Sequence, residues 1–277
     1  MKNFKKLLAV LLAGLMLLSL AACGAKDENV VKKGMLEVGD FEGIRTPAHL
    51  EHMNSKMGRP DGAGSDYVKY SNLSAALMDL ESGKIVCVCV EECVANYVAA
   101  RNDNLTVRDT GMKSSFSMMT TDSNKEVYDI LNNAIIEMKA DGTLDKLIEN
   151  ELMAYINSDP TPKDLPHFDG ARTIKVGVTG DLPPMDFVAS NGKAAGFNIA
   201  LLAEIANRAQ INIELVQIET GARPMALSSG KVDAVFWTRD LTCTVCNASS
   251  SEAVEGTIVT ESYFSAKSTI LELNSAK

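Results

Sequence analysis

Polar and charged side chains gather at three points in the C-terminal part of the sequence, each directly after a stretch typical of a buried strand. Those points are residues 179–185, 219–223 and 237–240. The carboxyl ends of parallel strands meet at one edge of a sheet, and ligands of open α/β sheets bind there. Arg239 can hold a carboxylate through two parallel hydrogen bonds, and Asp181 and Thr238 can add polar contacts. These residue types predict recognition of a small polar molecule.

Motifs typical of catalysis do not accompany these residues. The sequence contains neither a Gly-x-Ser-x-Gly nucleophile turn nor a His-Glu-x-x-His zinc motif. Glu91, Glu92 and Asp181 offer an alternative interpretation, as the paired carboxylates of a cell-wall hydrolase. The chain has no room for a separate catalytic domain, so we expect binding without catalysis and no cofactor.

Cysteines form a second group that could do chemistry. Five follow Cys23, an odd number, so at least one thiol has no partner within the chain. The five are Cys87, Cys89, Cys93, Cys243 and Cys246. The last two have the C-x-x-C spacing of a redox or metal site. The alternative is a set of small buried hydrophobes with one loop disulfide, which requires no metal and is our expectation. Histidines are scarce: His49 and His52 are spaced i, i+3, and His167 stands alone.

The first 23 residues have the layout of an export signal. Three lysines precede an uncharged apolar run over residues 7–20, and small residues lead to Cys23. Ending on a cysteine resembles a bacterial lipoprotein signal, in which Cys23 becomes the lipidated first residue. A retained membrane anchor is the alternative, although the run is short against the about 20 residues of a spanning helix. Residues 24–34 then form a polar tether, which implies an extracytoplasmic location at the cell membrane.

The charge of the chain excludes one class of partner. The formal net charge is −9, and removal of the three signal lysines makes it −12. No basic tract remains, so nucleic acid is excluded as an expected partner. The remaining length suits one medium domain or two small lobes.

The elements that position the polar residues follow an alternating pattern. Apolar spacing predicts helices over residues 73–80, 127–138, 144–152 and 197–209, and strands over residues 85–90, 116–120, 174–178 and 211–215. A helix end, a Ser-Gly-Lys turn and an apolar run occur twice, at residues 80–90 and 227–236. Alternation of strand and helix implies a parallel sheet with crossover helices, an α/β fold. Pro160, Pro162 and Pro166 mark residues 157–172 as a linker between two halves.

Several stretches together resemble one known family. The blocks are IKVGVTGDLPPM at 174–185, NGK at 191–193, GFN at 196–198, SGKVDA at 229–234 and TESYFS at 260–265. They are similar to the first lobe of the family 3 solute-binding proteins, the extracellular receptors of polar amino acid ABC importers. Residues 73–152, with KADGTLDKL at 139–147, resemble the second lobe and the C-terminal helices. The resemblance implies a two-lobed type II periplasmic-binding-protein-like fold with a hinge.

The order of these blocks differs from that of the family, in which the first lobe precedes the second. Here residues 35–156 resemble the second lobe and its C-terminal helices, and residues 173–277 resemble the first lobe. A circular permutation explains this order. A reduced tandem is the alternative, because KKGMLEVG at 32–39 resembles a family first strand. With either a permutation or a reduced tandem, the chain contains about one complete two-lobed receptor.

The resemblance also implies roles for particular residues. An acidic residue after the second-lobe strand binds the ligand ammonium in the family, and that position is Glu91 here. The family arginine for the ligand carboxylate falls at Val245, so Arg239 or Arg223 would replace it, unless either forms a structural ion pair. Family aromatic rings are replaced by Leu182, Met185 and Thr220. Trp237 offers a ring instead, or belongs to the core.

These features predict a lipid-anchored receptor that closes around a small polar solute and serves an ABC permease. A sensor or scavenger of the same fold without an importer is the alternative. The departures at the ligand-contacting positions put an ordinary α-amino acid in doubt as the solute.

Overall fold

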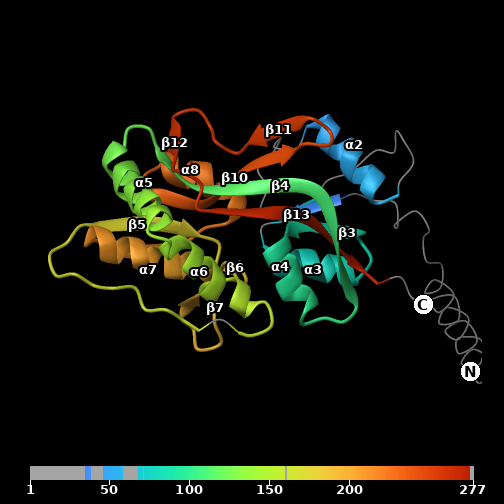
Figure 1. Ribbon diagram of the computed structural model, residues 1–277, viewed down its shortest axis with the longest axis horizontal. Helices are drawn as coiled ribbons and strands as arrows, with labels where there is room; N and C mark the ends of the chain where they lie inside the picture. The colour runs from blue at the N-terminus through green and yellow to red at the C-terminus, as the bar shows by residue number, and fades with distance from the viewer. Residues whose placement is uncertain (1–34, 39–45, 59–67, 71, 160, 275–277) are drawn as a thin grey trace, which may run out of the picture.

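The computed structural model describes residues 35–38, 46–58, 68–70, 72–159 and 161–274 (Figure 1). The expected signal, Cys23 and the tether lie outside these ranges. Up to the linker the elements are β1 (Met35–Val38), α2 (Pro47–Lys56), β2 (Val68–Tyr70), α3 (Leu73–Glu81), β3 (Cys87–Glu91), α4 (Glu92–Ala99), β4 (Leu105–Thr121), α5 (Lys125–Ala140), α6 (Thr143–Glu151) and the 3-10 turn η2 (Met153–Tyr155). After the linker they are β5 (Thr173–Val178), β6 (Asp181–Leu182), β7 (Asp186–Val188), β8 (Ala194–Ala195), α7 (Phe197–Ala209), β9 (Asn212–Gln217), η3 (Thr220–Ala222), α8 (Arg223–Ser228), β10 (Ala234–Cys243), β11 (Ala248–Ser251), β12 (Thr257–Val259) and β13 (Phe264–Leu273).

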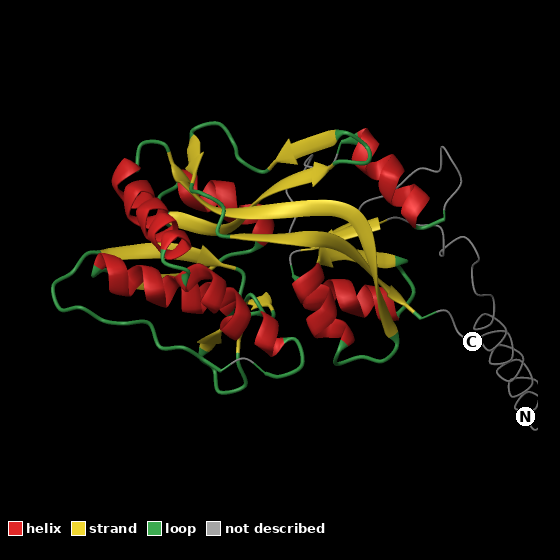
Figure 2. Cartoon of the chain, in the orientation of Figure 1, coloured by secondary structure: helices red, strands yellow, loops and turns green. Residues whose placement is uncertain are grey.

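One large sheet connects two similarly built halves. Its strand order is β2-β1-β3-β13-β4-β10-β5-β9, with β11 beside β10 and β12 beside β4. In the first half β1 lies between β2 and β3, and in the second half β5 lies between β9 and β10, all in parallel pairs. Crossover helices join these strands, as Figure 2 shows. The predicted α/β class is therefore confirmed.

Two long strands, β4 and β13, run between the halves (Figure 1). They pair antiparallel from Phe116 opposite Phe264 to Leu105 opposite Leu273. β13 also pairs with β3 of the first half, and β4 also pairs with β10 of the second half. The sequence predicted only residues 116–120 of β4 as a strand. Its first part alternates polar and apolar residues and carries Gly111, so it lacks the continuous apolar run of a buried strand.

A β-bulge bends β4 near its start. The register passes from Asp109 opposite Thr269 to Met112 opposite Ser268, so Thr110 and Gly111 are extra residues on β4. Gly111 takes a left-handed conformation with φ +75°, which suits glycine. The carbonyl oxygen of Thr110 accepts a hydrogen bond of 2.6 Å from Nε2 of His52 on α2. The bulge thereby curls the sheet and attaches α2 to it.

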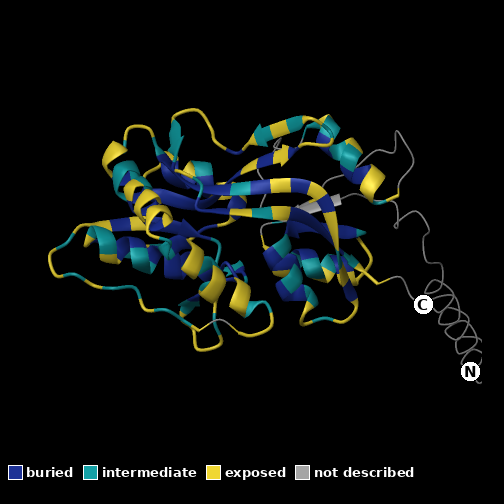
Figure 3. Ribbon diagram, in the orientation of Figure 1, coloured by how far each residue is buried: buried dark blue, intermediate teal, exposed yellow. Residues whose placement is uncertain are grey.

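Side-chain alternation on β3 separates two cores. Val88 and Val90 belong to the main core, which α3 and α4 cover. Cys87 and Cys89 point to the opposite face, into a smaller core with Met53 of α2. Figure 3 shows the buried strands between the layers of helices. The main core is continuous across both halves, because it also includes residues of β5, β10 and α7.

The helices that follow β4 cover the second half. α5 and α6 both contact α7. Arg208 of α7 donates a hydrogen bond of 2.8 Å to Asp141, between α5 and α6. Residues 157–159 and 161–172, in the predicted linker, contain neither helix nor strand.

Gly196, at the start of α7, provides a test of this packing. Its φ is +108°, and an added Cβ would lie 2.4 Å from the carbonyl oxygen of Met185. We expect Gly196→Ala to lower the free energy of unfolding by about 3 kcal/mol or more, because backbone atoms cannot move aside. Gly192→Ala is the matched control: φ is +80° there and nothing lies within 4 Å. It should cost only about 1 kcal/mol. Urea unfolding of both variants checks this, and equal losses would contradict the packing described for Gly196.

Candidate functional site

A cavity of about 560 Å³ lies between the two halves of the molecule. On one side is the N-terminus of α3, and on the other are the residues that follow β5 and β9. β5 and β9 are neighbouring parallel strands, so their carboxyl ends open onto the same edge of the sheet. A volume of this size suits a small organic molecule. The described lining residues are Asn72, Ser74, Thr179, Asp181, Gln217, Ile218 and Glu219.

Asp181 bridges the two halves at this cavity. One carboxylate oxygen accepts a hydrogen bond of 3.0 Å from Oγ of Ser74, and the other accepts one of 3.2 Å from the Ser74 backbone N–H. Ser74 lies in the first turn of α3, where backbone N–H groups point outward and favour a negative charge. The side chain of Asn72 caps the same turn by accepting from Ala75 N–H. Asp181 therefore supplies an anion to a helix of the opposite half.

The other polar lining residues come from the end of β9. Gln217 donates a hydrogen bond of 3.1 Å from Nε2 to the carbonyl oxygen of Thr179, which leaves Oε1 as an acceptor. Glu219 is exposed, and its carboxylate has no hydrogen-bond or ion-pair partner among the described residues.

Buried Asp186 fixes the turn that presents Thr179 and Asp181. It accepts hydrogen bonds from Oγ1 of Thr179 at 2.6 Å, Gly180 N–H at 2.7 Å and Nδ2 of Asn198 at 2.7 Å. A carboxylate with three donors is well satisfied in the interior. Asp186 was not predicted as a site residue. It follows a proline turn, and its position in the sequence does not show which donors will surround its carboxylate.

Arg239 and Glu91, expected to hold opposite ends of a ligand, lie against each other. The Nη1 atom of Arg239 is 3.3 Å from Oε1 of Glu91, and Nη2 is 3.5 Å from Oε1 of Glu252. The other oxygen of Glu252 accepts from Arg239 N–H at 3.1 Å. All three are at most 3% exposed, and burial lowers the pKa of Arg239 while Glu252 opposes that shift. The described cavity lining includes neither Glu91 nor Arg239.

Arg223, the second predicted carboxylate-binding residue, is fully buried in a backbone cage. It donates from Nε to the carbonyl oxygen of Thr220 at 3.1 Å, and from Nη1 to those of Phe236 at 2.9 Å and Trp237 at 2.6 Å. Burial lowers the pKa of the Arg223 guanidinium. These bonds tie the start of α8 to the first part of β10.

Trp237 lies in the aromatic part of the main core. Its ring stacks on Phe116 with centroids 4.0 Å apart, and Phe264 follows at 6.4 Å. Its backbone N–H donates to the hydroxyl of Tyr263, whose pKa burial raises well above the ordinary value. A φ of +70° is rare for a bulky residue and coincides with a register shift in β10. The ring of Trp237 is therefore part of the core, the second of the two roles considered for it from the sequence.

The remaining predicted ligand residues are buried. Leu182 and Met185 belong to the main core, and the sulfur of Met185 lies 3.7 Å from that of Cys93 on α4. Thr220 and Thr238 are less than a tenth exposed. Among the predicted ligand residues, Asp181 lines the cavity. The sequence reasoning missed Asn72, Ser74 and Gln217. The first two follow β2, whose three residues give too short a pattern to recognise.

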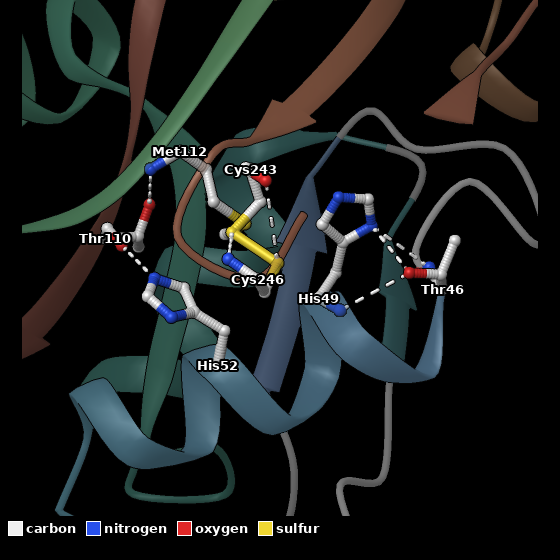
Figure 4. The surroundings of a disulfide bond; sticks show 7 residues. All are labelled: Thr46, His49, His52, Thr110, Met112, Cys243 and Cys246. Atoms are coloured by element: carbon white, nitrogen blue, oxygen red, sulfur yellow. Dashed lines mark hydrogen bonds between the residues drawn. A yellow bond between two sulfur atoms is a disulfide. The ribbon is translucent and has the colours of Figure 1, made fainter. Parts of the chain in front are cut away.

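Figure 4 shows the disulfide between Cys243 and Cys246, which closes the turn between β10 and β11. Cys87, Cys89 and Cys93 are buried and form no disulfide. His52 points to the Thr110 carbonyl, while the Nδ1 atom of His49 faces Thr46. Within the described ranges, no group of three or more His, Cys, Asp or Glu side chains could hold a metal ion. His167 lies apart on the surface, 3.4 Å from Asp169. The loop disulfide that we expected, alongside cysteines that act as small buried hydrophobes, is present.

The helices of the described segments include none that is both long enough and apolar enough to cross a membrane.

Residues 174–243 match the family model of the bacterial extracellular solute-binding proteins, family 3. This confirms, over that segment, the resemblance seen at residues 174–185, 196–198 and 229–234. The segment contains β5, β9 and β10, and therefore the strand ends that border the cavity. The matched family consists of extracellular binding proteins rather than enzymes. No curated protein sequence matches the chain.

Solved structures show a distant likeness. One is the ligand-binding component of an ABC-type import system from Staphylococcus aureus with zinc bound, at TM-score 0.44 and 9% identity, covering 87% of this chain and 65% of that one. Another is the GluR0 ligand-binding core from Nostoc punctiforme with L-glutamate, at 0.38 and 10%, covering 87% and 84%. A third is an ancestral arginine-binding protein bound to arginine, at 0.40 and 14%, covering 89% and 87%. At these scores the likeness identifies no ligand for this chain.

The buried ion pair leads to a stability prediction. Arg239→Leu should lower the free energy of unfolding by about 3–5 kcal/mol, because Glu91 and Glu252 lose the guanidinium that faces them in the interior. Arg172→Leu breaks an exposed pair with Glu126 and is the matched control, with a loss below about 1 kcal/mol. Urea unfolding measures both. A loss for Arg239→Leu no larger than the control would show that the buried pair adds nothing.

The three buried cysteines outside the disulfide lead to a labelling prediction. N-ethylmaleimide should leave Cys87, Cys89 and Cys93 unmodified in native buffer and label all three in denaturant. Each side chain is less than a twentieth exposed, and burial raises the pKa of the Cys93 thiol, which suppresses the reactive thiolate. Peptide mass spectrometry reads the result. Native labelling at Cys87 or Cys89 would mean that the core beneath α2 opens in solution.

Proposed function

We propose that this protein is a solute-binding receptor of the extracytoplasmic membrane face, anchored through a lipid on Cys23. It binds a small polar solute in the cavity between its halves and delivers that solute to the permease of an ABC importer. The observation that carries the proposal is the position of the cavity. It lies at the carboxyl ends of β5 and β9, two strands of the segment that matches the solute-binding family.

Closure of the two halves is the mechanism that this architecture supports. β4 and β13 are the long connections between the halves, so small changes along them turn one half relative to the other. The contact between Asp181 and Ser74 spans the cavity edge and exists only when the halves are close. A solute that touches both sides adds its binding energy to that contact and favours the closed arrangement.

The lobe order supports a circularly permuted receptor. The family-matched segment starts at residue 174, after the linker 157–172, and a complete β2-β1-β3 unit with the same strand order precedes it. Helices α5 and α6 follow the first unit in sequence and pack on the second. We assign residues 35–156 to the second-lobe-like half with the C-terminal helices, and residues 173–277 to the first-lobe-like half. Pairing of β1 with both β2 and β3 makes the first unit whole, which favours permutation over a reduced tandem.

A thermal-shift screen tests the receptor function. The chain from residue 24 onward is melted with amino acids, amines, organic acids and sugars. A solute at a hundredfold excess over its Kd adds about 2.7 kcal/mol and should raise the melting temperature by roughly 5–10 °C. Failure of every solute class to shift the melting temperature would overturn the receptor function.

A cavity-filling variant locates the site. Ser74→Trp places an indole at the cavity and should abolish the shift, whereas Ser82→Trp, at the other end of α3, should leave it intact. An unchanged shift in Ser74→Trp would mean that the solute binds elsewhere.

A further inference from the structure

The charges around the cavity are of one sign. Asp181 and Glu219 supply two carboxylates, and the other five described lining residues are neutral. No cationic side chain belongs to the described lining. A ligand carboxylate in this position would meet two negative charges without a compensating positive one.

The buried arginines do not change this balance. The guanidinium of Arg223 donates to three backbone carbonyl groups, and that of Arg239 lies between Glu91 and Glu252. Turning either arginine toward a ligand would remove it from these partners and leave buried carboxylates or carbonyl oxygens without their donor. Both guanidinium groups therefore interact with other parts of the protein rather than with a ligand.

The hydrogen-bonding groups of the lining point to the same conclusion. Asp181 accepts one bond per oxygen from Ser74, and a carboxylate oxygen can accept a second. Glu219 offers a carboxylate with no partner among the described residues, and Gln217 offers Oε1. The two carboxylates thus have no cationic partner in the described lining, and groups that carry only donors, such as ammonium and guanidinium, complement them.

We propose that the cavity selects small organic cations and has no requirement for a ligand carboxylate. This deepens the proposed receptor function and rests on it. Primary ammonium or guanidinium groups bind to Asp181 and Glu219 from inside the cavity. The formal net charge of −9 favours the approach of a cation from solvent. A volume of about 560 Å³ fits an organic cation with a carbon chain rather than a bare metal ion.

Pairs of compounds that differ by one carboxylate test this selectivity. Agmatine is compared with L-arginine, cadaverine with L-lysine, and glutarate serves as the anionic probe. We expect agmatine and cadaverine to bind at least about tenfold more tightly than the amino acids that carry the additional carboxylate. Glutarate should give no shift of the melting temperature. Calorimetric titration of the chain from residue 24 onward measures the Kd values.

A matched pair of variants tests whether the carboxylate of Glu219 contributes to binding within the cavity. Glu219→Gln should weaken binding of the better amine about tenfold, since it removes a charge while keeping the side-chain size. Glu214→Gln, at an exposed position of β9 outside the lining, removes the same charge and should leave binding unchanged. Equal weakening in both variants would show a general charge effect and overturn the role of Glu219.

The outcomes separate this proposal from the receptor function. Tighter binding of L-arginine or L-lysine than of the matching amine overturns the cation selectivity and leaves the receptor function standing. Binding of glutarate, or of neutral solutes alone, does the same. The absence of a shift with every solute class overturns the receptor function and the selectivity together.

Discussion

The antiparallel pairing of β4 with β13 is the constraint on which the rest of the molecule depends. Each strand is also paired to one half, β13 to β3 and β4 to β10, so this ladder joins two parallel units into one sheet. Without it, α3 and the ends of β5 and β9 would not face each other across the cavity. Chain segments more than a hundred residues apart form this ladder. The geometry of the site is therefore a property of the whole fold.

Burial decides the role of the charged residues near the interface. A guanidinium in the interior must be neutralised or fully hydrogen-bonded, because the loss of its hydration is expensive. Arg239 meets this requirement with two carboxylates, and Arg223 meets it with carbonyl oxygens that include those of Phe236 and Trp237 in β10. Arg239 thereby links the two halves, whereas Arg223 ties α8 to β10 within the second half. Asp181 and Glu219 are less buried and keep acceptor capacity toward the cavity.

Much of the fold could be predicted from local pattern. The apolar stripe that predicts α5, the alternation of Ile174, Val176 and Val178 in β5, and the Ser-Gly-Lys turns before β3 and β10 each depend on neighbours in sequence. The parallel order of β9, β5 and β10 follows from their crossover helices. The bulge in β4 and the full length of β13 depend on pairing across the chain, and no local period indicates them.

The candidate site shows the same division. Strand ends indicated that residues near 181 and 219 border a ligand, and the cavity is found there. Strand ends could not, however, predict which side chains face each other in the folded protein. Glu91 was correctly placed at the end of β3, but Arg239 lies within β10, which continues to Cys243. The two residues are 148 positions apart, and only the assembled sheet brings them within 3.3 Å.

The bulge in β4 also decides the chemical form of one imidazole. A carbonyl oxygen accepts and never donates, so the 2.6 Å contact with Thr110 requires a hydrogen on Nε2 of His52. The neutral ring is therefore the Nε2–H tautomer, with Nδ1 as its acceptor. The attachment of helix α2 to the sheet therefore depends on one tautomer of His52.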